Sequence, residues 1–96
     1  MGEVVDLHDA ALLTITFDWK MGTGTLRVRP TSHSETAIVA TGVRFIAVHP
    51  EHPWGPSVYI NEVRGPARTE ADLQRVEIQM QSGDLITIAA ESIELP

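Results

Sequence analysis

Residues 75–88 read RVEIQMQSGDLITI, and this stretch decides the fold class. Apolar and polar side chains alternate on both sides of its central SGD tripeptide, which is the period-two pattern of half-buried β-strands. The apolar faces of the two strands match when Met80 lies opposite Ile86 and Ile78 lies opposite Ile88. The SGD tripeptide is then a three-residue loop, so the stretch predicts a β-hairpin with one buried face.

The same alternation recurs along the chain and predicts six strands. In the first hairpin, the apolar faces match with Phe17 opposite Leu26 and Ile15 opposite Val28, which leaves the turn at 20–23. We therefore predict an all-β fold, an antiparallel meander of about six strands that forms either a small barrel or a strongly curved sheet. The alternating or β-branched apolar runs occupy residues 13–17, 25–29, 37–48, 58–60, 75–81 and 86–90.

Gly42 interrupts the longest of these runs. Before it, Ile38 and Ala40 share one face, and after it apolar residues occur on both faces of 45–48. A glycine between two apolar stretches predicts a bulge or a bend. A bend allows one strand to serve two parts of a sheet or to close a barrel, so we expect this strand to be central.

The length and composition of the chain limit what it can be. Its 96 residues account for one domain, 1–96, and leave no room for a cleft between domains. The absence of cysteine excludes disulfides, thiolate zinc sites and cysteine nucleophiles.

The charge of the chain argues against a nucleic-acid partner. The chain has 13 Asp and Glu against 7 Lys and Arg, and residues 49–96 carry eight of the acids and three of the bases. Because an acidic surface repels phosphate, we expect no nucleic-acid partner, and the acidity suits a basic protein instead.

The sequence has no run of 18 apolar residues and no basic, apolar secretory signal at its start. We therefore expect a cytoplasmic protein without a membrane partner.

The least ordinary segment is 49–56, which reads HPEHPWGP. Its prolines recur every three residues, which predicts an extended, stiff polyproline II connection. The functional alternatives are a metal site using His49 and His52, or an exposed recognition loop carrying Trp54. The structural alternative is a rigid connector with Trp54 folded over an edge of the core. Residues three apart in polyproline II lie about 9 Å apart, so we predict no metal and no cofactor here.

His8 and Asp9 are the second candidate pair. Adjacent residues on a strand point to opposite faces, so the two side chains cannot easily form a hydrogen-bonded dyad within one strand. In a turn, Asp9 would cap local backbone N–H groups and His8 would be buried against the sheet. This alternative makes the pair a structural entry to the first strand.

No catalytic constellation is complete in the sequence. The Ser/His neighbourhood at 31–34 lacks an orienting acid and a Gly-x-Ser-x-Gly elbow, so we interpret it as a polar loop. Glu62, Glu70 and Asp72 are expected in or near loops, where nothing fixes two carboxylates at a catalytic separation. Glu70 and Asp72 also belong to a weak capping box before about one helical turn. We therefore predict that the protein is not an enzyme.

Two stretches carry a family resemblance. The entry segment VDLHDA at 5–10, which leads into an alternating strand ending at 18–19, and the segment EIQMQSGDLI at 77–86 resemble small, uncharacterised bacterial all-β proteins. Some of those proteins are similar to immunity proteins of polymorphic toxin systems. The resemblance implies a protein-binding function directed at a toxin domain, and it implies no defined site residues.

The sequence thus predicts a non-enzymatic protein–protein binding module. The alternative is a small-molecule or metal-binding module in a barrel mouth, using one of the three histidines at 8, 49 and 52. A sheet must protect its edges, and charges are sparse over 37–43, so we also expect a homodimer formed through an edge strand or an apolar patch. The candidate binding residues are His49, His52, Trp54, His8 and Asp9.

Overall fold

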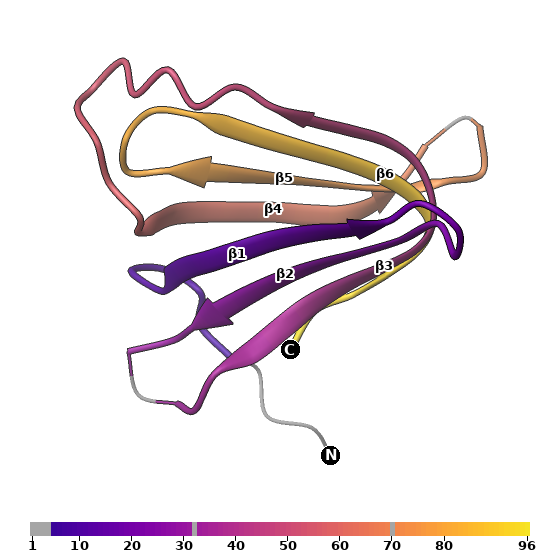
Figure 1. Cartoon of the computed structure of the whole chain (residues 1–96), viewed down its shortest axis with the longest axis horizontal. Coiled ribbons are helices and arrows are strands. Elements are labelled where there is room, and N and C mark those ends of the chain that lie inside the picture. The colour runs from indigo at the N-terminus through magenta and orange to yellow at the C-terminus, as the bar shows by residue number, and fades with distance from the viewer. Residues whose placement is uncertain (1–4, 32, 70) are drawn as a thin grey trace.

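The computed structural model describes residues 5–31, 33–69 and 71–96, which form one six-stranded antiparallel sheet (Figure 1). The described residues contain no helix, and hence none long and apolar enough to cross a membrane. The all-β class and the six antiparallel strands are therefore confirmed. The strands are β1 (Ala11–Asp18), β2 (Thr23–Arg29), β3 (Thr36–Val48), β4 (Ile60–Arg68), β5 (Gln74–Met80) and β6 (Leu85–Glu94).

The strand order is β1-β2-β3-β6-β5-β4, so the sheet consists of two three-stranded meanders joined between β3 and β6. The predicted meander holds within each half, but β3 pairs with β6 rather than with β4. In Figure 1 β4 and β5 lie above β1 and β2, whereas β3 and β6 bend at the right of the view, so that each of them runs along both layers. Both halves contribute side chains to one buried cluster, which includes Leu26, Ile38, Ile78 and Ile88.

The sheet is strongly curved and open. Its outer strands, β1 and β4, share no ladder, although an isolated antiparallel bridge joins Ala11 to Tyr59, just before β4, and the amide of Ile60 donates to the carbonyl oxygen of Ala10 at 2.8 Å. Beside this bridge the amide of Leu12 donates to the carbonyl oxygen of Val58 at 2.8 Å. Of the two predicted architectures, the structure thus has the curved sheet and not the closed barrel.

The true edges of the sheet differ from the expected one. Residues 37–43 lie inside β3, which pairs with β2 on one side and with β6 on the other. The expectation that this sparsely charged run is an exposed edge is therefore wrong. The edge strand β4 carries the charged residues Glu62, Arg64 and Arg68, whereas residues 12–17 of the edge strand β1 read LLTITF and carry no charge.

The predicted bend at Gly42 is confirmed. Gly42 has a φ of +65°, and the β3–β6 register shifts between Val43 and Phe45. A Cβ atom at this position would lie 2.6 Å from the side chain of Glu91, so both the backbone angle and the neighbouring strand favour glycine. The bulge also changes which residues face inwards, because Val43 and Ile46 both pack against the core instead of lying on opposite faces.

The predicted register of the 75–88 hairpin is wrong by two residues. Ile78 pairs with Ile86 and Val76 pairs with Ile88, and the three-residue loop is 81–83. A slip of two residues leaves every side chain on its original face, so the alternation cannot distinguish these registers. The predicted buried face itself is confirmed, since five of its apolar side chains are at most 5% exposed: Val76, Ile78, Met80, Ile86 and Ile88.

The first hairpin shows the same displacement. Ile15 pairs with Leu26 and Phe17 pairs with Gly24, so the turn lies at 19–22, one residue earlier than predicted. The amide of Gly22, which has a φ of +67°, donates to the carbonyl oxygen of Asp18 at 2.8 Å. A bulge between Leu12 and Thr14 turns Leu12 to the same side of the strand as Ile15, so both side chains pack against the core.

The segment after residue 58 is more regular than predicted. β4 continues to residue 68, so Glu62 lies in a strand and not in a loop. The alternation is hidden there because Gly65 and Pro66 interrupt it, and the β4–β5 register shifts beside them. The predicted helical turn is wrong: Thr69 exchanges hydrogen bonds with Leu73 and closes the β4–β5 hairpin. Glu70 of the capping box and Ser32 of the 31–34 loop lie outside the described residues.

Candidate functional site

The segment 49–57 makes up most of the connection between β3 and β4 and turns back on itself. The amide of Gly55 donates to the carbonyl oxygen of His52 at 2.9 Å, and these two residues have φ values of +100° and +54°. Polyproline II has negative φ angles and no internal hydrogen bonds, so the predicted extended conformation is wrong. A positive φ is uncommon for a residue other than glycine, and the backbone of His52 therefore needs support from its surroundings.

Asp84, in the turn between β5 and β6, provides that support. Its side chain is 7% exposed, and its Oδ1 atom accepts hydrogen bonds from the amides of Glu51 and His52, both at 3.0 Å. Its Oδ2 atom accepts from Nδ1 of His52 at 2.8 Å and from the hydroxyl of Ser82 at 2.7 Å. Four hydrogen bonds thus converge on one carboxylate, three of them from the 49–57 segment.

The protonation of this group follows from the same contacts. Burial raises the pKa of Asp84, but the hydrogen bonds from Ser82, from His52 and from Glu51 outweigh burial and hold the pKa below its usual value. An ionised carboxylate only accepts hydrogen bonds, so Nδ1 of His52 carries the proton that it donates. In the neutral imidazole, Nε2 is then the free acceptor.

Trp54 lies on the outside of this anchored segment. Its amide donates to the carbonyl oxygen of Ser82 at 2.8 Å, while its side chain is 67% exposed. The indole ring rests against Gly83, where a Cβ atom would lie 2.7 Å from it. The ring therefore covers the tip of the β5–β6 hairpin and not the centre of the core.

His49 lies at the start of the segment and is exposed, and its carbonyl oxygen accepts a hydrogen bond from the amide of Glu51 at 2.9 Å. The side chain of His52, by contrast, is tied to Asp84. Over 5–31, 33–69 and 71–96, no three His, Asp or Glu side chains lie close enough together to hold a metal ion.

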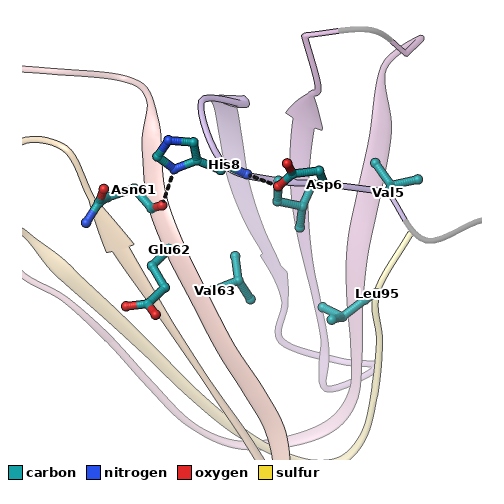
Figure 2. Close-up of a pocket in the computed structure, with 8 residues that line it drawn as sticks. Val5, Asp6, His8, Asn61, Glu62, Val63 and Leu95 are labelled. Carbon is teal, nitrogen blue, oxygen red and sulfur yellow. Dashed lines mark hydrogen bonds between the residues drawn. The ribbon is translucent and has the colours of Figure 1, made fainter.

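His8 and Asp9 form the turn that precedes β1, beside a separate pocket of about 390 Å³ (Figure 2). Nδ1 of His8 lies 2.6 Å from the carbonyl oxygen of Asn61 on β4, as the dashed line in Figure 2 marks. Its Nε2 atom lies 3.5 Å from the carboxylate of Asp9. The hydrogen bond to Asn61 and the nearby carboxylate of Asp9 raise the pKa of His8.

The turn thus differs in two respects from the structural entry expected for this pair. The side chain of His8 is 56% exposed and is not buried against the sheet. The local backbone cap is Asp6, whose Oδ1 atom accepts from the amide of His8 at 2.9 Å, whereas Asp9 accepts a hydrogen bond from the side chain of Gln81. A φ of +66° at Asp9 bends the chain here, which lets adjacent side chains approach each other as they could not on a strand.

Sequence reasoning missed Asp84, Ser82 and Asn61. Matching the apolar faces of the hairpin places Asp84 in its three-residue loop, where aspartate is common and signals no further role. Its partners at 51 and 52 lie more than thirty residues earlier in the chain. The signal in the sequence is indirect: a segment with three prolines has few amides of its own, and the amides that remain need an acceptor from elsewhere.

Comparison with other proteins adds no relative. No family model, no curated protein and no solved structure matches this chain. The resemblance to immunity proteins therefore stays a prediction, and the function of the site has to follow from its geometry.

Proposed function

We propose that this protein is a non-enzymatic protein-binding module and that the segment 49–57 is its recognition loop. The observation that carries the proposal is a large aromatic side chain, Trp54, held 67% exposed on a backbone that Asp84 and Ser82 fix in place. A preformed loop loses little conformational entropy when a partner binds. Tryptophan is also enriched among the residues that dominate binding energy.

Neighbouring side chains extend this surface along the chain. Val58 and Tyr59, which follow the recognition loop, are 57% and 49% exposed. Single exposed apolar residues are common on soluble proteins, but three large ones within six residues favour an interaction site.

Charge suggests the kind of partner. Residues 49–96 carry eight acidic and three basic side chains, so the half of the chain that contains the recognition loop is strongly acidic. Complementary charge speeds association and suppresses wrong partners. We therefore propose a basic protein as the partner, of the kind that the resemblance to immunity proteins implies, a cationic toxin domain.

The contacts of Ser82 support a non-enzymatic role. In a Ser-His-Asp triad the serine is hydrogen-bonded to the histidine, which takes its proton. Here the hydroxyl of Ser82 donates to Oδ2 of Asp84, the same oxygen that accepts from His52. Both side chains are thus donors to one carboxylate, an arrangement that holds a loop and does not activate the serine.

The test is capture of a partner by the tagged full chain from its native cell, with matched tryptophan variants. Trp19, in the β1–β2 turn, is 88% exposed and serves as the control for Trp54. We expect the wild type and Trp19→Ala to retain the same basic protein at low salt. Trp54→Ala should bind it at least about 30-fold more weakly, which corresponds to a hot-spot loss of about 2 kcal/mol.

Two results would contradict the proposal. Full-affinity capture by a folded Trp54→Ala variant would remove the recognition loop from the interface. Capture that does not weaken as salt is raised would remove the charge complementarity, because exposed charges are screened at high ionic strength.

A further inference from the structure

A cavity of about 150 Å³ lies on the inner side of the recognition loop, where the two ends of the curved sheet approach each other. Its apolar wall includes Leu12 and Ile15 of β1, Val48 at the end of β3 and Ile86 at the start of β6. Its polar side consists of His52, Ser57, Ser82 and Asp84. The hydroxyl of Ser82 donates to Asp84, and that of Ser57 accepts a hydrogen bond from the amide of Tyr59. The cavity therefore has an apolar body and one polar side, which is the usual composition of a small-molecule site.

The size of the cavity limits its occupant. An enclosed engineered cavity of about the same volume, lined by aliphatic side chains, takes up a single benzene ring, whereas this cavity is partly open to solvent. The occupant here is accordingly a molecule with about one six-membered ring.

The hydrogen bonds at the polar side limit the chemistry of the occupant. Both oxygens of the Asp84 carboxylate already accept two hydrogen bonds each, so a cationic ligand gains no free acceptor there. The ionised carboxylate also repels a ligand that carries its own carboxylate. The nitrogen that remains is Nε2 of His52, which in the neutral ring accepts a hydrogen bond. The matching ligand is uncharged and brings a donor.

The ring of His52 makes a hydrogen bond in addition to those that attach the backbone of the loop. The backbone of the loop is attached through the amides of Glu51 and His52 and through the amide of Trp54. The additional bond from Nδ1 to Asp84 fixes the tautomer and the orientation of the imidazole, as second partners do for functional histidines. A fixed acceptor beside an apolar cavity is a preorganised binding group.

We propose that this cavity binds a small neutral aromatic alcohol, of the class of phenol, whose hydroxyl donates a hydrogen bond to Nε2 of His52. This goes beyond the protein-binding function proposed above, although Pro50, His52 and Ser57 of the recognition loop also line the cavity. Trp54 does not line it, so the Trp54→Ala variant separates ligand binding from partner capture.

The experiment is a titration of the ¹⁵N-labelled full chain, followed by amide chemical shifts, with phenol, toluene and benzoate as probes. Phenol should shift the amides of Leu12, Ile15 and Ile86 saturably. Toluene, which lacks the donor, should bind roughly three- to tenfold more weakly, the loss expected for one neutral hydrogen bond. Benzoate should cause no saturable shift at these amides.

Two variants and a control locate the site. His52→Ala should lower phenol affinity to that of toluene and leave toluene affinity within about twofold. Slow hydrogen exchange of the Trp54 amide, which donates to Ser82, would report that the loop is still in place. Ile15→Phe keeps the His52–Asp84 pair and fills the cavity, so it should abolish binding of both probes. His8→Ala is the control, because His8 also donates from Nδ1 to a fixed acceptor but lies beside the other pocket. It should bind phenol like the wild type.

Three outcomes would overturn the proposal. They are the absence of saturable shifts up to the solubility limit of phenol, equal affinities for toluene and phenol, and undiminished phenol binding by Ile15→Phe. Trp54→Ala should bind phenol normally even if it no longer captures a protein partner.

Discussion

Replacing Gly83 with alanine tests whether the tip of the β5–β6 hairpin holds Trp54 in place. A Cβ atom at position 83 would lie 2.7 Å from the indole ring and 2.9 Å from the ring of Pro53, so the indole has to move away. Gly83 also has a φ of +91°, and a positive φ costs other residues about 1–2 kcal/mol. If the indole loses on the order of ten atomic contacts, the loss adds about 1 kcal/mol. We therefore expect Gly83→Ala to lower the free energy of unfolding by about 2–3 kcal/mol.

A double-mutant cycle separates the two contributions. In a Trp54→Ala background there is no indole to displace, so Gly83→Ala should cost about 1 kcal/mol less, and the backbone strain and the contact with Pro53 remain. Urea denaturation followed by circular dichroism measures all four proteins, since the signal does not depend on the deleted tryptophan. Equal costs of Gly83→Ala in the two backgrounds would refute the contact between the indole and the hairpin tip.

Four further predictions concern the fold, the anchor, metals and self-association. Ile78→Ala, at a fully buried position, should lower the free energy of unfolding by about 2–5 kcal/mol, and Gln79→Ala on the opposite face by less than about 1 kcal/mol; similar losses at both positions would contradict the assigned faces. The folded state lowers the pKa of Asp84, so its contribution to stability is complete above the unfolded pKa of about 3.9 and is lost as the pH falls through the folded pKa. Asp84→Asn should therefore flatten the acid limb of a plot of unfolding free energy against pH, and an unchanged limb would count against the anchor. Treatment with EDTA should leave the melting temperature unchanged, whereas a drop that zinc reverses would reveal a structural metal. Light scattering at high micromolar concentration should show a dimer, and Thr16→Lys on the uncharged β1 edge should shift it to a monomer; a monomeric wild type would contradict self-association.

In the 75–88 hairpin the sequence predicted the buried face better than the pairing. Alternation assigns Ile78 and Ile86 to the buried face regardless of which residues they pair with, because a slip of two residues keeps that face. The register depends on the turns, and the loop at 81–83 differs from the predicted one by a single residue. Sequence patterns also cannot identify the strand that pairs with β3, since pairing with β6 depends on how two distant meanders fit together.

The candidate site was predicted only in part. His52 and Trp54 are unusual in the sequence because they stand among prolines, and the structure places both in one anchored turn. Asp84, which anchors that turn, is an ordinary hairpin aspartate by composition. Its role comes from contacts with residues 51 and 52, which only the folded chain brings near. Local patterns contain no information on such contacts.

The junction between β3 and β6 has a consequence for how the molecule assembles. Each half of the chain consists of strands that pair with their sequence neighbours, so each can form local contacts early, whereas the β3–β6 ladder has to close a long loop. The segment 49–57 lies within that loop, and its anchor, Asp84, directly precedes β6. Val48 pairs with Ile86, two residues after Asp84, so closing the β3–β6 ladder brings the start of the segment beside its anchor. A partner that recognises the anchored conformation would favour chains in which this ladder has formed.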